Sequence, residues 1–239
     1  MTNKCSNWIG PLVIISLLLI ITSSCQKNLG NVNVPSTITD IDGNVYHTIK
    51  IGSQVWLVEN LRTTRYRNGN PIPNVTDSTA WNSLTTGAYC NYNNDDANSA
   101  IYGRLYNWVA ISDTDSIAPK GWHIPAQTEW TTMTTFLGNV NNVGGMLKET
   151  GTTHWQTPNA GANNGSLFTA LPGGERLSHG KFTSIGATGA WWSSTYDGTY
   201  DAWGRYINYN DSAIFRYDDT RKVGLSVRCV MDIKYVSAY

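Results

Sequence analysis

The sequence is poor in charge. Charged residues make up 14% of the chain, 17 basic residues are balanced by 17 acidic ones, and no run of Lys or Arg occurs. A nucleic-acid partner would call for a basic surface, so we expect none. Trp, Tyr and Gly are abundant instead, a composition that favours short strands and aromatic-studded loops over long amphipathic helices.

Catalytic and zinc-binding motifs are missing as well. The sequence contains no C-x-x-C pair, no G-x-S-x-G, no P-loop and no G-x-G-x-x-G fingerprint. The histidines stand singly, without an H-x-x-x-H or H-E-x-x-H spacing, at positions His47, His123, His154 and His179. We therefore expect scattered structural histidines, no catalytic residues and no required cofactor.

The one long apolar run lies at the N-terminus. Residues 8–21 read WIGPLVIISLLLII, shorter than the ~20 residues that cross a bilayer but typical of the core of a secretory signal peptide. The following "TSSC" resembles the lipobox of bacterial lipoproteins, although Thr22 stands where a large aliphatic residue is usual. We expect a signal peptide over 1–24 and lipidation of Cys25, with the body anchored in the cell envelope, at the outer membrane, on either face. A plain signal peptide or an uncleaved anchor is the alternative.

Only Cys90 and Cys229 then remain as ordinary cysteines. In an oxidising compartment the pair could form a disulfide that closes a long loop. Two free, buried thiols are the alternative, and the sequence leaves both open.

The remainder is organised as one domain over 38–232, preceded by a polar tether over 25–37 and followed by a tail over 233–239. Residues 45–51 alternate apolar and polar side chains as one half-buried strand would, with the apolar set starting at Val45. Gly52 then begins a turn into a second strand, so the segment is predicted to form a hairpin.

Two short helices follow a loop-like stretch. One is expected over 101–111 despite Gly103, and the other begins after Pro125 and stops at Gly138. The buried face of the second helix is predicted to contain Trp130, Met133, Thr134 and Leu137. Residues 139–190 are rich in Gly and Asn and predict long loops, held down by Trp155, Phe168 and Leu171.

The last third returns to strands. Segments such as AWWSSTY, AWGRYINYN, AIFRYD and VGLSVRCVMD alternate apolar and polar residues between turns, which predicts an antiparallel meander. The parts together indicate the α+β class, with antiparallel strands, two short helices and long loops.

Several motifs in order resemble one family. DIDGNVYHTIKIGSQVWLVENLRT, YGRLYNW, PKGWHIPAQTEW, LKETGTTHW, FTALPGGER, WWSST and GLSVRCV resemble the Fibrobacter succinogenes major paralogous domain family, over about residues 38–232. This resemblance implies a bacterial lipoprotein or secreted surface protein and no common activity. Family members commonly carry a cysteine before P-x-G-W-H-x-P, where Ala118 stands here, so the usual bridge to Cys229 is absent.

A more distant likeness concerns the fold. GWHIPAQTEW, FTALPGGER, WWSST and GLSVRC are similar to landmarks of formylglycine-generating-enzyme-like proteins, which implies a C-type-lectin-like fold that joins N- and C-terminal strands. Those enzymes use a pair of reactive cysteines near the C-terminus, of which this sequence has only Cys229. Fold likeness does not carry function with it.

Two acidic segments are candidate calcium sites, because hard cations take clustered carboxylates from loops. One contains Asp95 and Asp96, and the other surrounds Asp197 and Asp201. Neither has the EF-hand pattern, and Asn/Asp-rich turns without metal are the alternative.

A ligand surface is the other candidate. Aromatic residues crowd residues 191–209, where exposed rings would stack on sugars, and the chosen ligand-binding candidates are Tyr196, Asp197, Tyr200 and Asp201. Burial of Trp191 and Trp192 in the core is the alternative there. The acidic motifs of calcium-dependent lectins are absent.

The decapeptide GWHIPAQTEW raises one more question, because it places a histidine near a glutamate. Pro125 and Glu129 fit a helix start, with Glu129 in the first turn. Ala126 occupies the cap position and offers no side-chain oxygen, so a capping box would lack one half. We expect His123 not to be catalytic.

The sequence as a whole favours a non-enzymatic, lipid-anchored envelope protein that binds a glycan or protein ligand or serves in surface display. Two alternatives stay open: a divergent oxidoreductase of formylglycine-generating type, and a structural subunit of a surface assembly.

Overall fold

The computed structural model describes residues 34–198 and 200–232. The expected signal peptide 1–24, the lipidation site Cys25 and the tail 233–239 lie outside these residues. The folded unit begins at Val34, slightly before the predicted boundary. Within the described ranges, no helix is long and apolar enough to span a membrane.

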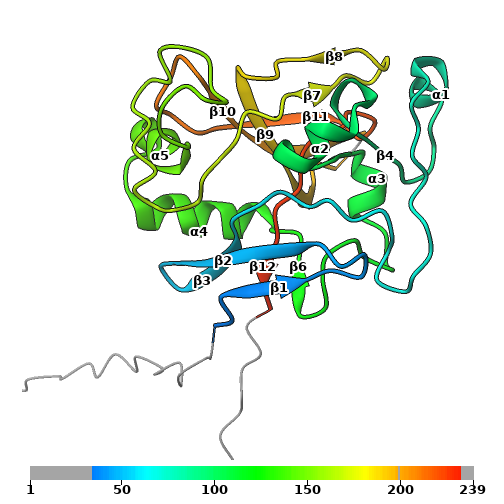
Figure 1. The fold of residues 1–239 in the computed structure, drawn as a ribbon, viewed down its shortest axis with the longest axis horizontal. Helices are drawn as coiled ribbons and strands as arrows, with labels where there is room; N and C mark the ends of the chain where they lie inside the picture. Colours follow the sequence, from blue (N-terminus) through cyan, green and yellow to red (C-terminus); the bar gives the residue numbers. More distant parts are fainter. Residues whose placement is uncertain (1–33, 199, 233–239) are drawn as a thin grey trace, which may run out of the picture. The chain divides into compact units, whose positions relative to one another are not determined.

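Antiparallel strands dominate the domain (Figure 1). They are β1 (Thr37–Thr39), β2 (Val45–Ile51), β3 (Gln54–Leu57), β4 (Tyr89–Cys90), β5 (Leu105–Tyr106), β6 (Trp122–His123), β7 (Glu175–Arg176), β8 (Phe182–Thr183), β9 (Thr188–Tyr196), β10 (Asp201–Asn208), β11 (Phe215–Thr220) and β12 (Val230–Met231). Among the described residues, the largest sheet has the order β1-β2-β3-β12-β6, and a second has the order β11-β10-β9. Two small ladders pair β4 with β5 and β7 with β8.

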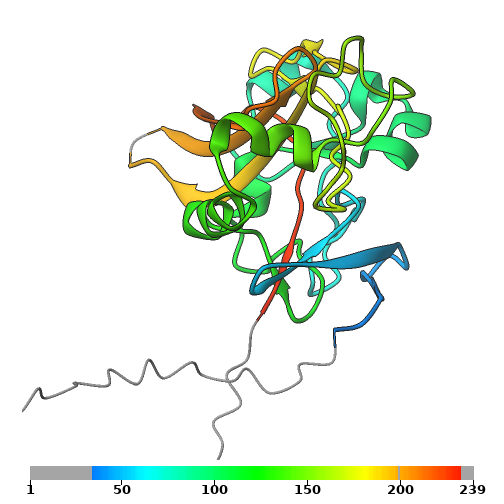
Figure 2. The ribbon, with the colours of Figure 1, turned by 90° about the vertical axis from the view of Figure 1, so that its left-hand side faces the viewer.

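The helices are short. They are α1 (Ser78–Asn82), the 3₁₀ turn η1 (Tyr92–Asn94), α2 (Asp96–Tyr102), α3 (Trp108–Ile111), α4 (Gln127–Leu137) and α5 (Val140–Leu147). Figure 2 shows α4 beside the hairpin of β9 and β10, where the amide of Gln127 donates to Oγ1 of Thr195 at 3.0 Å. Short helices with separate antiparallel sheets confirm the α+β class.

The N-terminal hairpin is confirmed, with β2 and β3 paired from Thr48 opposite Leu57 onward. Its buried face differs from the prediction at one end. Tyr46 is fully buried and donates its hydroxyl to Oδ2 of Asp40 at 2.7 Å, whereas Val45 is 49% exposed. The two ends of β2 pack into different core clusters, so the strand buries opposite faces at its two ends.

The single helix predicted over 101–111 is wrong. Gly103 has a φ of 79°, and a Cβ there would lie 2.6 Å from Cβ of Asn60, so the chain turns sharply where it packs. Residues 105–106 form β5 instead, and Asn107 caps the new helix α3 by accepting a hydrogen bond from the Ala110 amide. The close packing of Gly103 against Asn60 therefore interrupts the helix that the spacing of apolar residues predicts over 101–111.

The predicted helix after Pro125 is confirmed as α4, which ends before Gly138. The amide of Ala126 donates to Oε2 of Glu129 at 2.8 Å, and Ala126 itself has no side-chain oxygen to complete the cap. The expected face contacts the core, with Trp130, Met133 and Thr134 buried and Leu137 partly buried.

Residues 139–190 contain more structure than predicted. The helix α5 lies at their start, and its two central glycines would discourage a helix on propensity alone. A Cβ at Gly144 would lie 2.1 Å from the carbonyl oxygen of Ala213, so the glycine permits close packing. Trp155 and Phe168 are buried as expected, and Leu171 is half-buried.

The meander of β9, β10 and β11 is confirmed, but residues 223–232 do not form a further antiparallel strand of it: Ser226 makes a single parallel bridge to Trp191 of β9. Beyond this bridge the chain crosses to the larger sheet, where Val230 pairs with Trp56 of β3. Arg228 directs this path, because its buried guanidinium donates to Oδ1 of Asn60 and to the carbonyl of Phe168. The crossing joins N- and C-terminal strands in one sheet.

Candidate functional site at the tip of the β9–β10 hairpin

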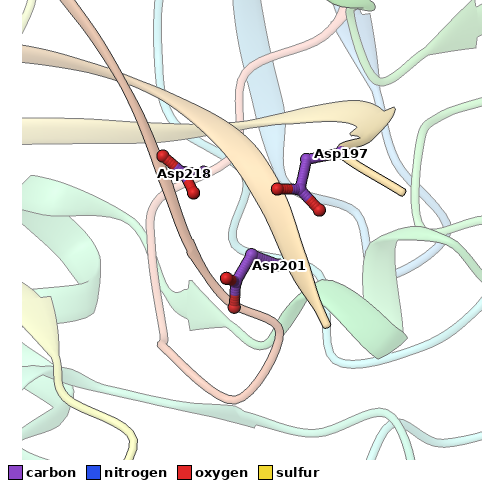
Figure 3. A group of neighbouring side chains, drawn as sticks. All are labelled: Asp197, Asp201 and Asp218. Atoms are coloured by element: carbon purple, nitrogen blue, oxygen red, sulfur yellow. The ribbon is translucent and has the colours of Figure 1, made fainter. Parts of the chain in front are cut away.

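Three aspartates meet at one end of the smaller sheet. Asp197 follows β9, Asp201 begins β10 and Asp218 lies on β11, and one carboxylate oxygen of each lies within 4.8 Å of the others. Figure 3 shows the three side chains around one shared space. The strand register explains two of them: Asp218 lies opposite Trp203, two residues beyond Asp201, so both aspartates lie on the same face.

This geometry suits a hard cation, which binds carboxylate and carbonyl oxygens. Asp197 and Asp201 are half-buried and Asp218 is exposed, so the site opens to solvent. The negative charge also acts on Asp219, whose pKa is raised first by burial and then by Asp218 and Asp201, against a hydrogen bond from Tyr206 that lowers it.

Two exposed tyrosines, Tyr196 and Tyr200, lie beside the acidic tip at the hairpin turn. Tyr200 is 78% exposed and Tyr196 is 41% exposed, whereas the exposed Tyr217 lies on the other face of β11 from Asp218 and packs on Tyr206 and Phe215. Tyr196 is held from two sides, by the Trp108 ring at 5.7 Å and by the guanidinium of Arg221 at 5.5 Å from its ring centroid. Rings fixed at the surface provide contact area for a ligand at low entropic cost.

All four predicted ligand-binding residues lie at this tip. The structure adds Asp218, which sequence analysis missed because it lies on a neighbouring strand. Trp191 and Trp192 do not take part: both are fully buried, and their indole N–H groups donate to Asn60 and Tyr106. Their alternative interpretation, as core residues, is confirmed.

Asp95 and Asp96 both make local hydrogen bonds. Asp95 caps α2 by accepting from the Ala97 amide at 2.9 Å, and Asp96 accepts from the amide side chain of Asn91 at 2.5 Å. Within the described ranges, the potential metal ligands that gather in a group of three or more are Asp197, Asp201 and Asp218. Local hydrogen bonding therefore accounts for the acidic run around Asp95.

The disulfide considered for Cys90 and Cys229 is not formed, because both are free, buried thiols in different core clusters. Burial raises the pKa of Cys90 to about 11, although Arg176 opposes the shift. Burial raises the pKa of Cys229 as well. Neither thiol is therefore prone to form a thiolate at neutral pH.

His123 is held between two carboxylates. Its Nδ1 lies 2.5 Å from Oδ1 of Asp232, and its Nε2 lies 2.7 Å from Oε1 of Glu129. The hydrogen bond with Glu129 is the largest cause of a raised pKa for His123, with burial opposing it and Asp232 adding to it. Both ring nitrogens thus connect β6 to the start of α4 and the end of β12.

The molecule so described is an α+β domain of antiparallel sheets with an acidic, tyrosine-rich hairpin tip. The chain belongs to the Fibrobacter succinogenes major domain family, whose model matches residues 49–231. Membership assigns no activity. No curated protein and no solved structure gives a significant match to the chain.

Proposed function

We propose that the protein is a non-enzymatic, lipid-anchored protein of the bacterial outer membrane, whose domain binds a glycan or an envelope protein through the tip of the β9–β10 hairpin. The observation that carries this proposal is the grouping of two exposed tyrosines, Tyr196 and Tyr200, with three aspartates at one end of a sheet. Aromatic side chains combined with a few polar groups are typical of binding surfaces.

The anchor rests on the sequence, where the apolar run of 8–21 precedes the lipobox-like Cys25. Cells expressing the full chain and fed a labelled fatty acid should yield a labelled, membrane-associated protein. Cys25→Ala should lose both the label and the association. Retention of the label by this variant would place the lipid elsewhere.

A C-type-lectin-like fold is part of the proposal. The pairing of β12 with β3, which joins the two ends of the domain in one sheet, supports it. Long loops between short elements support it too. An experimental structure whose topology departs from that fold would refute this part and leave the binding site standing.

The oxidoreductase alternative is disfavoured by the cysteines. Copper-thiolate chemistry needs two adjacent, accessible thiols, whereas Cys90 and Cys229 are buried in separate clusters. Reaction of the folded protein with a thiol reagent should therefore be slow, and stoichiometric binding of copper by both thiols would overturn the non-enzymatic proposal.

Binding is tested by a glycan array and by pull-down from cell envelopes, each with matched variants. Tyr200→Ser should weaken binding about tenfold or more, as loss of an exposed aromatic anchor does. Ile101→Ser is the control, because Ile101 is 48% exposed on α2. Equal binding by wild type and Tyr200→Ser would show that the tip is not the site.

Calcium is the proposed ion for the three aspartates. At a calcium concentration of about 100 times Kd, bound calcium would stabilise the fold by roughly 2.7 kcal/mol, which thermal melting detects. Asp201→Asn should abolish the increase in Tm. An unchanged Tm in the wild type would refute calcium binding while leaving ligand binding by the tyrosines open to the array.

A further inference from the structure

Arg205 on β10 makes fewer hydrogen bonds than its burial calls for. It is 7% exposed, its Nη2 donates to Oγ1 of Thr131 at 3.1 Å, and its Nε is buried without a partner. In the described part of the chain, Arg205 forms no ion pair. A buried charge without compensation is unfavourable, so this guanidinium is suited to a further partner.

The other deeply buried arginines are satisfied. Arg228 donates through Nε and Nη2 to Asn60 and through Nη1 to Phe168, and its guanidinium lies 3.9 Å from the Phe168 ring centroid. Arg176 donates from all three nitrogens to backbone carbonyls. Arg205 differs from these two arginines, because its buried Nε has no hydrogen-bond partner.

A second cation stands directly opposite. Arg216 of β11 pairs with Arg205 in the strand register, so both side chains lie on the same face of the sheet. Like charges in this arrangement repel. Burial, followed by Arg216, lowers the pKa of Arg205 to about 10. Arg216 is exposed and its guanidinium lies 4.4 Å from the ring centroid of Trp203, which holds it over the sheet.

Polar groups of α4 lie beside Arg205. Thr131 is exposed on α4, so the end of Arg205 that it contacts lies near the surface. Both side-chain amide atoms of Gln127, one turn earlier on α4, are buried without a partner among the described residues. Figure 2 shows α4 beside the β9–β10 hairpin. Unsatisfied polar atoms thus concentrate where α4 meets the sheet.

We propose that Arg205 and Arg216 form a binding site for a carboxylate or sulfate group of an acidic ligand. Guanidinium groups bind such planar or tetrahedral oxyanions through paired charge-assisted hydrogen bonds. An oxyanion between the two arginines removes their repulsion and supplies the acceptor that Arg205 lacks. The site lies on the same face as Asp201 and Asp218, with Trp203 between the acidic and the basic ends.

This site extends the proposed binding function to a neighbouring surface and needs no calcium. The test is therefore made in calcium-free buffer, with ¹⁵N-arginine-labelled protein titrated with sodium sulfate and with sodium acetate. Sodium chloride at matched ionic strength controls for screening. The Nε–H signals of Arg205 and Arg216, assigned by their loss in Arg205→Lys and Arg216→Gln, should shift saturably with the oxyanions.

The variants decide the outcome. Arg216→Gln removes an exposed side chain and should weaken sulfate binding about tenfold or more. Arg221→Gln is the matched control, because Arg221 also stacks on an aromatic ring, that of Tyr196, and it should bind sulfate as the wild type does. If Arg205→Lys melts cooperatively, its sulfate affinity should fall as well; if it unfolds, Arg216→Gln decides alone.

Three results would each overturn the proposal: shifts that never saturate, shifts that chloride reproduces, and unchanged sulfate affinity in Arg216→Gln. Asp201→Asn and Tyr200→Ser should retain sulfate binding, so failure at the hairpin tip and failure at the arginine pair can be told apart.

Discussion

Replacing His123 with Gln should destabilise the fold in a pH-dependent way. Hydrogen bonding to Glu129, with Asp232 assisting, raises the pKa of His123 above its usual 6.5. Its contribution to stability is therefore complete below about pH 6.5 and is lost as pH rises through the folded pKa. Burial acts to raise the pKa of Glu129, but hydrogen bonds from His123 and from the Ala126 amide outweigh it and lower this pKa below 4.5. The Glu129 contribution is present above pH 4.5 and is lost as pH falls through its folded pKa.

Both contributions are therefore complete between about pH 4.5 and 6.5. The His123 side chain is 41% exposed, so solvent screens its ion pairs and each of the two is worth only about 0.5 to 1 kcal/mol. The total loss in His123→Gln at pH 5.5 should be about 1 to 2 kcal/mol, or roughly 2 to 8 °C in Tm for a domain of this size.

Urea unfolding at pH 5.5 and at pH 8.5 measures the difference in the free energy of unfolding between the wild type and His123→Gln. This difference should be smaller at pH 8.5 than at pH 5.5. The control His179→Gln, which changes an exposed histidine, should have the free energy of unfolding of the wild type at both pH values. A difference in the free energy of unfolding that grows with rising pH would refute the reasoning. Ligand binding by His123→Gln should be intact, and its loss in a folded variant would assign His123 a part in the site.

Three further predictions concern the core. Lys148→Met removes the donor to the carbonyls of residues 160, 208 and 211 and should lower the free energy of unfolding by about 2 to 4 kcal/mol; a loss below about 1 kcal/mol would contradict this role. Gly144→Ala introduces a Cβ 2.1 Å from a backbone oxygen and should lower Tm by several degrees. Asn142→Ala, on the exposed side of the same helix, is the control and should leave Tm unchanged; equal Tm values for the two variants would contradict the prediction. Cys90 and Cys229 should react with a thiol reagent only after unfolding, with a Tm independent of reductant; a Tm that falls on reduction would indicate a disulfide.

Local signals predicted some elements well. The start of α4 follows from Pro125 and Glu129, its end from Gly138 and its buried face from helical spacing, and all three features appear in the structure. Each signal acts within a few residues of the chain. The strands of the meander have the same property, because alternation and turn residues are local.

Other features depended on contacts between distant segments. Gly103 interrupts a helical pattern because Asn60 lies against it, and Gly144 remains in a helix because the chain near Ala213 approaches it. Residues 223–232 alternate like a further antiparallel strand of the meander, yet only Ser226 bridges β9, and beyond it buried Arg228 holds the chain on its way to the other sheet. In each case packing across the core overrides the local preference.

The candidate sites also have parts that local sequence predicts and parts that depend on contacts between distant segments. The sequence by itself determined that Asp197, Asp201, Tyr196 and Tyr200 cluster, since one hairpin turn joins them. Only the tertiary structure decided that Asp218 completes the acidic group.

The same holds for Arg205 and Arg216, which lie opposite each other on one face of the sheet. Strand register determines which side chains meet across a sheet, and a shift of one residue would turn Asp218 and Arg216 to the other face. That register is held by the packing of the whole domain.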